Sequence, residues 1–236
     1  MSVGRSDREE EVYRLTVYEG TDTLRNKLGI LDAQVLDSVE RRLTKERVRE
    51  GLPEEATHPT IDGLKAIHHH LLQDVYEWAG EFRRYTTGRG PAPFAVPEQI
   101  EPYLAKTFGQ LAAENDLKGL NADDFAARSA HYVSEINAVH PFIDGNGRTQ
   151  RLWLRNMADR AGYKIELESG DRDAWNAASR HGFAGYPEPM AHLIASRITP
   201  LIEQAVEKEA NEQGTQAPRL TGPPSLMQDR DDDMDR

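Results

Sequence analysis

Apolar residues recur at every third or fourth position through most of this chain, and this spacing constrains the fold more than any other feature. Such spacing places apolar side chains on one face of a helix. The clearest stripe predicts a helix from about residue 62 to 78, and it consists of Leu64, Ile67, Leu71, Val75 and Trp78. Six further helices are predicted: after Asp32 up to Gly51, after Pro97, after Asn121, over 146–161, over 171–181, and from Glu188 into the 200s with a kink at Pro200.

One stretch, residues 81–96, breaks the helical pattern. It reads EFRRYTTGRGPAPFAV, in which a β-prone run over 82–87 precedes a Gly-Arg-Gly-Pro turn and a second short run. Because glycine and proline favour turns, the stretch is predicted to form a two-stranded hairpin. An isolated hairpin is only marginally stable in water, so this one must pack on the helices. The sequence therefore predicts an all-α fold with a small β-hairpin.

The C-terminal residues 211–236 have a different composition from the rest. They hold three prolines and two glycines, lack aromatic residues, and end in an acidic run. Such a segment cannot bury enough apolar surface to offset the entropy cost of ordering it. We therefore predict a disordered acidic tail.

Composition excludes several classes of protein. The chain has no cysteine, which excludes a disulfide framework, a thiolate metal site and a cysteine nucleophile. No apolar run reaches the ~18 residues that would indicate a membrane span. The first residues lead into acidic side chains and do not resemble a secretory signal. We expect a cytoplasmic protein without a membrane partner, and the sequence leaves export to a host cell open.

The charge balance bears on the partners of the chain. Asp and Glu number 40 against 29 Lys and Arg, which gives a net charge of −11. Nucleic-acid backbones are bound by clustered basic residues. A nucleic acid is therefore not expected as a partner, except as part of a target complex.

The most informative segment is 140–151, with the sequence His-Pro-Phe-Ile-Asp-Gly-Asn-Gly-Arg-Thr-Gln-Arg between two predicted helices. Gly145 and Gly147 let successive backbone N–H groups converge on an anion, and the dipole of the following helix favours negative charge at the same place. Arg148 and Arg151 lie three residues apart on one helix face, where they can bind more than one phosphate. The segment therefore predicts a phosphate-binding turn.

Two further side chains in this segment suggest chemistry. Asp144 would repel a bare polyphosphate, but it is suited to holding Mg²⁺ that bridges phosphate oxygens. His140, four residues earlier, can reach the same pocket as a general base. Each of these features alone is common for structural reasons. Together in twelve contiguous residues they indicate phosphoryl or nucleotidyl transfer.

The segment resembles the Fic signature, His-x-Phe-x-Asp/Glu-Gly-Asn-Gly-Arg-x-x-Arg, and every fixed position is present. Residues 18–30 resemble the N-terminal segment of bacterial Fic toxins, and residues 67–80 resemble the helix before their hairpin. The likeness covers roughly residues 12–205. It implies three parts: an N-terminal extension over 1–11, a Fic domain over 12–210, and the tail over 211–236.

The resemblance implies an enzyme that transfers AMP from ATP to a hydroxyl side chain of a target protein. By position, His140 becomes the base that deprotonates this hydroxyl, and Asp144 holds Mg²⁺ on the α- and β-phosphates. ATP is then the co-substrate and Mg²⁺ the cofactor. The nucleotide-binding residues implied are Gly145, Asn146, Gly147 and Arg148 at the α- and β-phosphates, and Arg151 at the γ-phosphate.

The resemblance also bears on partners. The hairpin over 81–96 corresponds to the family's flap, which docks a segment of the target protein by main-chain pairing. Many Fic proteins carry an inhibitory Ser/Thr-x-x-x-Glu-Gly/Asn helix, of which this chain has only near-matches at Ser6–Glu10 and Thr199–Glu203. We therefore expect any inhibitory glutamate to come from a separate small antitoxin protein.

Two alternatives stay open at the level of sequence. Some Fic relatives transfer another phosphate-containing group, and the signature alone does not fix which group moves. The chain could instead be a non-catalytic module that binds extended peptides, although the presence of His140, Asp144 and Arg151 disfavours this reading.

Overall fold

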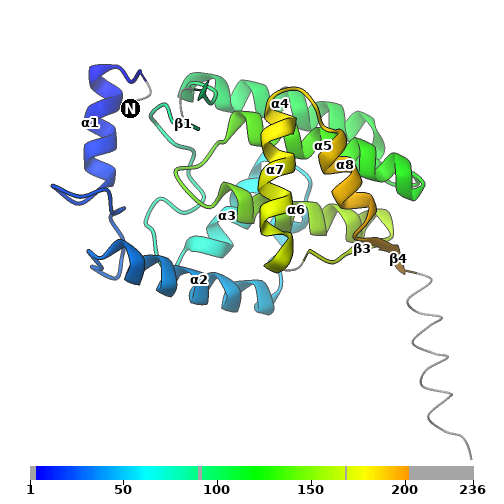
Figure 1. Cartoon of the computed structure of the whole chain (residues 1–236), viewed down its shortest axis with the longest axis horizontal. Coiled ribbons are helices and arrows are strands. Elements are labelled where there is room, and N and C mark those ends of the chain that lie inside the picture. The colour runs from blue at the N-terminus through cyan, green and yellow to red at the C-terminus, as the bar shows by residue number, and fades with distance from the viewer. Residues whose placement is uncertain (1–3, 90–91, 168, 202–236) are drawn as a thin grey trace, which may run out of the picture. The chain divides into compact units, whose positions relative to one another are not determined.

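The computed structural model describes residues 4–89, 92–167 and 169–201. These residues form eight α-helices and two small antiparallel sheets, which confirms the predicted mainly helical fold (Figure 1). The helices are α1 (Asp7–Thr16), α2 (Ala33–Glu50), α3 (Ile61–Leu72), α4 (Pro97–Ala113), α5 (Ala122–Val139), α6 (Asn146–Ala161), α7 (Arg172–Phe183) and α8 (Glu188–Ala195). The strands are β1 (Gly88–Arg89), β2 (Ala92–Pro93), β3 (Tyr163–Ile165) and β4 (Ile198–Pro200).

Helix α5 is the centre of the core, because it packs against α4, α6, α7 and α8. Its N-cap is Asn121, whose side-chain oxygen accepts a hydrogen bond from the amide of Asp124 at 2.9 Å. The predicted apolar stripe of this helix is buried, and it comprises Phe125, Tyr132, Val133, Ile136 and Val139. Burial of this stripe fixes the end of α5, from which the signature segment continues.

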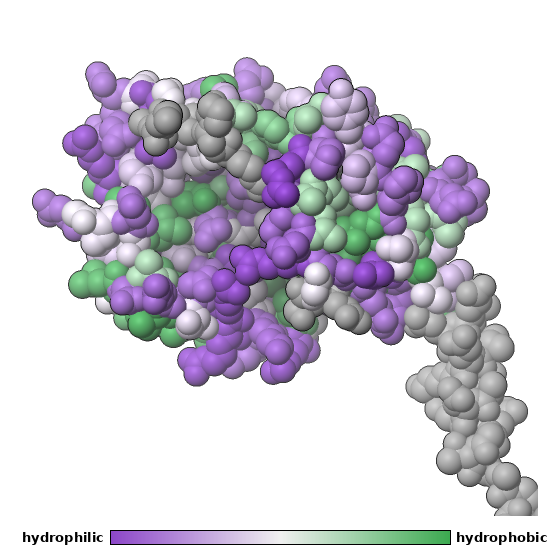
Figure 2. Space-filling model, in the orientation of Figure 1, coloured by the Kyte–Doolittle hydropathy of each residue, from purple (hydrophilic) through white to green (hydrophobic). Residues whose placement is uncertain are grey.

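Several other predicted helices also form where the sequence places them. The side chain of Asp32 caps α2, and the helix ends at Gly51, whose φ of 83° is favourable only for glycine. Helix α4 begins at Pro97, and α6 ends at Gly162 in the left-handed conformation. Figure 2 shows hydrophobic surface beside the N-terminal end of α2, where Leu28, Leu31 and Val35 are exposed.

The helix predicted from 62 to 78 is shorter than expected. Helix α3 ends at Leu72, and the chain continues through turns in which the Leu72 carbonyl accepts hydrogen bonds from the amides of both Val75 and Tyr76. The carbonyl of Val75 is taken by the amide of Lys27 at 2.8 Å. Val75 is nevertheless fully buried. The apolar spacing therefore continues past the helix because the turn packs on the same core.

The helix predicted from Glu188 into the 200s is wrong in its second half. Helix α8 ends at Ala195, and β4 then pairs antiparallel with β3, placing Pro200 opposite Tyr163. The amide of Leu201 continues this pairing by donating to the carbonyl of Gly162 at 3.0 Å. The β-branched residues of the Ile-Thr-Pro strand favour this extended structure, and Pro200 ends a strand where a kinked helix was expected.

The predicted hairpin is confirmed, but its paired part is short. Gly88 lies opposite Pro93, and Arg89 lies opposite Ala92. The β-prone run over 82–87 forms no regular strand. Its last residue, Thr87, still pairs with the second half of the hairpin, because its carbonyl accepts a hydrogen bond from the amide of Phe94 at 2.9 Å. This run departs from a regular strand because it is held by side chains of its own and of α1.

The division of the chain into domains stays a prediction. Residues Met1–Leu201 form one compact unit, and α1 spans the expected boundary between residues 11 and 12. The predicted tail over 211–236 lies outside the described residues, as does the end of the predicted Fic domain. Every helix in the described ranges is too short or too polar to cross a membrane.

Candidate active site

The signature segment connects the end of α5 to the start of α6. His140 is the C-cap of α5 and adopts the left-handed conformation, with φ 48° and ψ 63°, while its amide donates to the carbonyl of Ile136 at 3.0 Å. This conformation turns the chain sharply after the helix. The turn brings His140 to one side of the loop whose other side is the N-terminus of α6.

The loop is held in shape by Asn146 and Phe142. The side-chain amide of Asn146 donates to the carbonyl of Phe142 at 2.9 Å and accepts from the amide of Phe142 at 3.0 Å. Both residues are buried. The side chain of Asn146 is thus turned toward the loop itself, so any contribution of this residue to phosphate binding comes from its backbone amide.

His68 supports the loop from α3. Its ring lies against that of Phe142, with centroids 3.8 Å apart and planes at 6°. The amide of Gly80 donates to Nδ1 at 2.7 Å, so Nε2 carries the hydrogen and donates to the carbonyl of Asp144 at 3.0 Å. Burial lowers the pKa of His68 to about 3, and the imidazole stays neutral. No local sequence pattern indicated this contact, which joins residues 76 positions apart.

The N-terminus of α6 presents backbone donors. Gly145 has φ 77°, and a Cβ there would lie 2.6 Å from Cδ1 of Leu72, so only glycine fits. The amide of Gly145 donates to the carboxylate of Asp144 at 2.6 Å. The next three amides, those of Asn146, Gly147 and Arg148, have no partner among the described residues. Orphan amides at a helix N-terminus are the donors that bind phosphate.

Arg151 lies on the first turns of α6 as a half-buried cation. Burial lowers its pKa, and the positive charges of Arg148 and Arg172 lower it further. Its guanidinium lies 5.7 Å from the ring centre of the buried Trp175. Within the described ranges, no carboxylate forms an ion pair with it. This combination favours binding of an anion beside the amides of α6.

Asp144 provides one carboxylate at the mouth of this turn. Its side chain is 53% exposed, and Oδ2 lies 3.7 Å from Nη2 of Arg148. The described residues contain no group of three or more His, Asp or Glu side chains that could hold a metal by themselves. Mg²⁺ at nucleotide sites is usually held by one or two carboxylates together with substrate phosphates. The single accessible carboxylate of Asp144 therefore fits Mg²⁺ that arrives with a nucleotide.

Arg83 connects the hairpin to His140, the residue predicted to be the general base. No sequence motif singled out Arg83. It is buried, and its guanidinium donates to four backbone carbonyls: His140 at 2.8 Å, Tyr85 at 2.8 Å, Val139 at 3.0 Å, and Ala95. Its own amide donates to the carbonyl of Pro141 at 2.9 Å. One side chain thus ties both ends of the hairpin to the end of α5.

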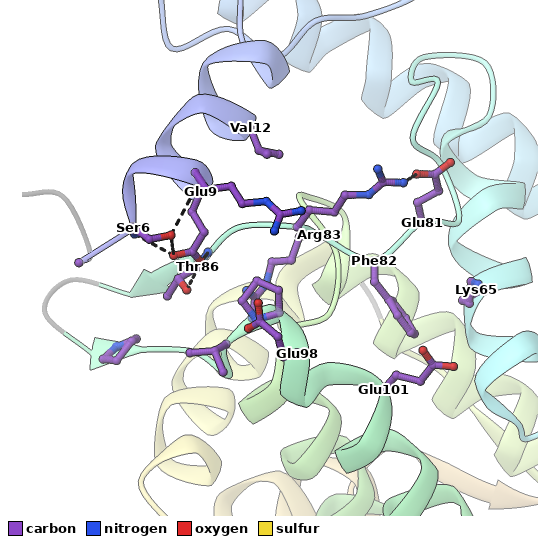
Figure 3. Close-up of a pocket in the computed structure, with 16 residues that line it drawn as sticks. Ser6, Glu9, Val12, Lys65, Glu81, Phe82, Arg83, Thr86, Glu98 and Glu101 are labelled. Atoms are coloured by element: carbon purple, nitrogen blue, oxygen red, sulfur yellow. Dashed lines mark hydrogen bonds and ion pairs between the residues drawn. The ribbon is translucent and has the colours of Figure 1, made fainter.

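A large groove of about 1220 Å³ lies beside the hairpin (Figure 3). Figure 3 shows Ser6 and Glu9 of α1 on one side, Glu98 and Glu101 of α4 on the other, and Arg83 between them. None of its lining residues belongs to the signature segment. The groove is therefore a surface separate from the signature segment.

The two near-matches to an inhibitory motif do not reach Arg151 in the described part of the chain. Ser6 caps α1, and Glu10 pairs with Arg5 at 3.4 Å and with Arg14 at 3.5 Å. Thr199 lies in β4, and Glu203 is outside the described residues.

Comparison with known proteins assigns this fold and site to a class. A model of the Fic/DOC family matches residues 58–158. The chain is 37% identical over 182 residues to a probable protein adenylyltransferase, y4lH, of Sinorhizobium fredii, covering 77% of this chain and 94% of the relative. A Fic domain from Bartonella quintana superposes with a TM-score of 0.75 at 28% identity, covering 85% of this chain and 99% of that one. The BepC protein of Bartonella tribocorum, solved with bound AMPPNP, superposes with a TM-score of 0.71 at 26% identity. The match covers 79% of this chain and 97% of that one.

The fold and the site thus define a Fic-domain protein that carries the complete twelve-residue signature segment. The chain belongs to the Fic/DOC family, and its relatives are protein adenylyltransferases. The predicted family and enzyme class are confirmed by these comparisons.

Proposed function

We propose that the protein transfers AMP from ATP to a hydroxyl side chain of a target protein. The observation that carries this proposal is the signature loop itself. Among the described residues, the amides of Asn146, Gly147 and Arg148 have no partner and Arg151 forms no ion pair, and His140 begins the same twelve-residue segment. Relatives of the chain are named protein adenylyltransferases, and a structural neighbour was solved with a bound ATP analogue.

In the proposed reaction, His140 accepts the proton of the target hydroxyl as this oxygen attacks the α-phosphorus of ATP. The new bond joins the target oxygen to the α-phosphorus, and the bond from that phosphorus to the bridging oxygen breaks. Pyrophosphate leaves with its electron pair. The amides of Asn146, Gly147 and Arg148 bind the α- and β-phosphates, and Arg151 binds the γ-phosphate. When bound at Asp144, Mg²⁺ would neutralise charge on the phosphates.

The hairpin of β1 and β2 is the proposed docking element for the target. A short exposed hairpin can add an extended segment of another chain to its edge. Arg83 supports this role because it fixes the base of the hairpin to the carbonyl of His140, which keeps a docked segment at a constant distance from the base. The adjacent groove leaves room for the rest of the target (Figure 3).

Incubation of the protein with ATP labelled at the α-phosphate and with cell lysate tests the proposal. Labelled protein bands are expected with the wild-type chain and Mg²⁺, and none with His140→Ala, because the base acts on the acceptor. Asp144→Ala and chelation of divalent cations should each abolish labelling. Mass spectrometry of the labelled protein separates AMP transfer from transfer of another phosphate-containing group. Labelling that persists in His140→Ala would refute the assignment of the base.

We further propose that any inhibitory glutamate comes from a separate antitoxin protein. The support is that Arg151 pairs with no carboxylate of the described residues, although its position suits one. The variant Glu203→Gly tests the alternative of an inhibitor within the chain. No change in self-labelling is expected, and a large increase would contradict a separate inhibitor.

A further inference from the structure

We propose that Glu40, on α2, is a positioning residue that orients Arg148 for nucleotide binding. This inference rests on the proposed function of the signature loop and names a residue outside the 58–158 match to the family model. Glu40 lies 108 positions before Arg148 in the sequence, and the two side chains form an ion pair through Oε1 and Nη1.

The surroundings of Glu40 are unusual for a carboxylate. The residue is only 4% exposed, and it lies between Leu36 and Thr44 in the middle of the buried face of α2. The hydroxyl of Tyr76 donates a hydrogen bond to its second oxygen. Tyr76 is buried and stacked on Trp78, with centroids 4.2 Å apart. Glu40 is thus held by groups on two sides, which gives its carboxylate one fixed position.

A buried ion pair is a weak source of stability, because the cost of removing two charges from water offsets much of their attraction. An apolar pair of similar volume would pack this face of α2 equally well. The position of the pair suggests a different role, since its cation belongs to the phosphate-binding loop and its anion belongs to the core. Glu40 is therefore best explained by what it does to Arg148.

The geometry of Arg148 shows what this effect is. Its side chain is 24% exposed, with Nη1 on buried Glu40 and Nη2 3.7 Å from the exposed carboxylate of Asp144. An arginine side chain free in solution has many rotamers, and fixing them on binding costs entropy. Because Glu40 fixes one edge of the guanidinium in advance, the other edge faces the mouth of the turn. The nucleotide then meets a preorganised cation.

The test is the affinity for AMPPNP with Mg²⁺, measured by calorimetry on the full chain, since this readout needs no transfer step. The variant Glu40→Gln keeps the size of the side chain and its contact with Tyr76 but removes the charge. We expect about tenfold weaker binding, as for the loss of a charge-assisted partner of a binding arginine. Asp37→Asn, in an exposed pair on the same helix, is the matched control and should bind normally.

A double-mutant cycle shows whether Glu40 acts through Arg148. If it does, Glu40→Gln should have no further effect on affinity in an Arg148→Ala background. An equal further loss in that background would overturn the proposal. So would unchanged or tighter binding by Glu40→Gln alone, since tighter binding would mean that Glu40 competes with the phosphates. If Glu40→Gln lowers the melting temperature too far for calorimetry, Tyr76→Phe replaces it, with a smaller loss of affinity expected and an unchanged affinity counting against the proposal.

This experiment separates the proposal from the function on which it rests. The variant His140→Ala should bind AMPPNP normally and label no target. If wild-type protein binds AMPPNP but labels nothing, the proposed transfer fails while the role of Glu40 in binding can still be measured.

Discussion

The imidazole of His140 lies flat against the phenyl ring of Phe94, with centroids 4.0 Å apart and planes at 4°. Phe94 follows β2 and meets the ring of Phe183, on α7, edge-on at 5.4 Å. One face of the proposed base is therefore covered by a residue of the flap. The position of the hairpin and the orientation of the imidazole are coupled through this stack.

Replacement of Phe94 by leucine keeps apolar volume and removes the flat surface. Because a stacked aromatic pair contributes roughly 0.5–1.5 kcal/mol, we expect the transfer rate to fall about 3- to 10-fold. The affinity for AMPPNP should stay the same, because Phe94 contacts the base and not the amides of α6. Self-labelling rates and calorimetry measure the two effects. A parallel loss of affinity would show that the stack supports the nucleotide site as well.

Arg83 and its neighbour Arg84 form a matched pair for a test of the hairpin anchor. Arg83→Met would leave four backbone carbonyls, two in buried and two in part-buried hydrogen bonds, without this donor, and we expect the free energy of unfolding to fall by about 3 kcal/mol. The side chain of Arg84 is 76% exposed, so Arg84→Met should change the free energy of unfolding by less than about 0.5 kcal/mol. Urea denaturation measures both variants. Similar values for the two would show that Arg83 is not an anchor.

Gly145→Ala tests the shape of the phosphate-binding turn. The added Cβ meets Leu72 at 2.6 Å with φ at 77°, so we expect a loss of about 1–3 kcal/mol in stability and weaker AMPPNP binding. Gly109→Ala in the exposed face of α4 is the control, because a Cβ there meets nothing within 4 Å. That change should stabilise the chain by up to about 1 kcal/mol. Normal binding by Gly145→Ala would show that the turn tolerates a side chain.

The neutral state of His68 predicts a pH dependence of stability. Its pKa of about 3 in the folded chain lies below the value of 6.5 for a free histidine. The unfolded chain therefore binds this proton first as the pH falls. The contribution of His68 to the free energy of unfolding is therefore complete above about pH 6.5. As the pH falls from 6.5 toward 3, this contribution is lost at ~1.4 kcal/mol per pH unit.

The variant His68→Gln keeps a donor for the carbonyl of Asp144 and removes the titration. Its unfolding free energy should therefore depend less steeply on pH between 6.5 and 4 than that of the wild type. Equal slopes for wild type and His68→Gln would contradict a neutral buried imidazole.

The sequence predicted helices best where the spacing, the cap and the stop all agreed. Helices α2, α5 and α6 form where they were predicted: Asp32 and Asn121 are the N-caps of α2 and α5, and α6 spans the predicted residues 146–161. The helix prediction failed past Leu72. Apolar spacing indicates which residues are buried, and Val75 is buried although it lies outside the helix. The prediction failed again at Ile198, because the partner strand of β4 follows α6, far away in the sequence.

The candidate site could be predicted only where it is contiguous. All of its predicted residues fall within twelve positions, and the structure places them around one loop. The residues that support this loop come from elsewhere: His68 from α3, Arg83 from the hairpin base, and Glu40 from α2. Their roles depend on contacts across 57 to 108 positions of sequence, for which the local pattern of an isolated chain carries no signal.

The anchor at Arg83 separates two properties that evolution can change independently. The guanidinium holds the hairpin at Tyr85 and Ala95, near its base, and donates to none of the described residues Gly88, Arg89, Ala92 and Pro93. Substitutions of these strand residues should therefore leave the backbone contacts that Arg83 makes with His140 in place. In this chain, one buried side chain thus separates the support of His140 from the part of the hairpin that the proposed function assigns to target docking.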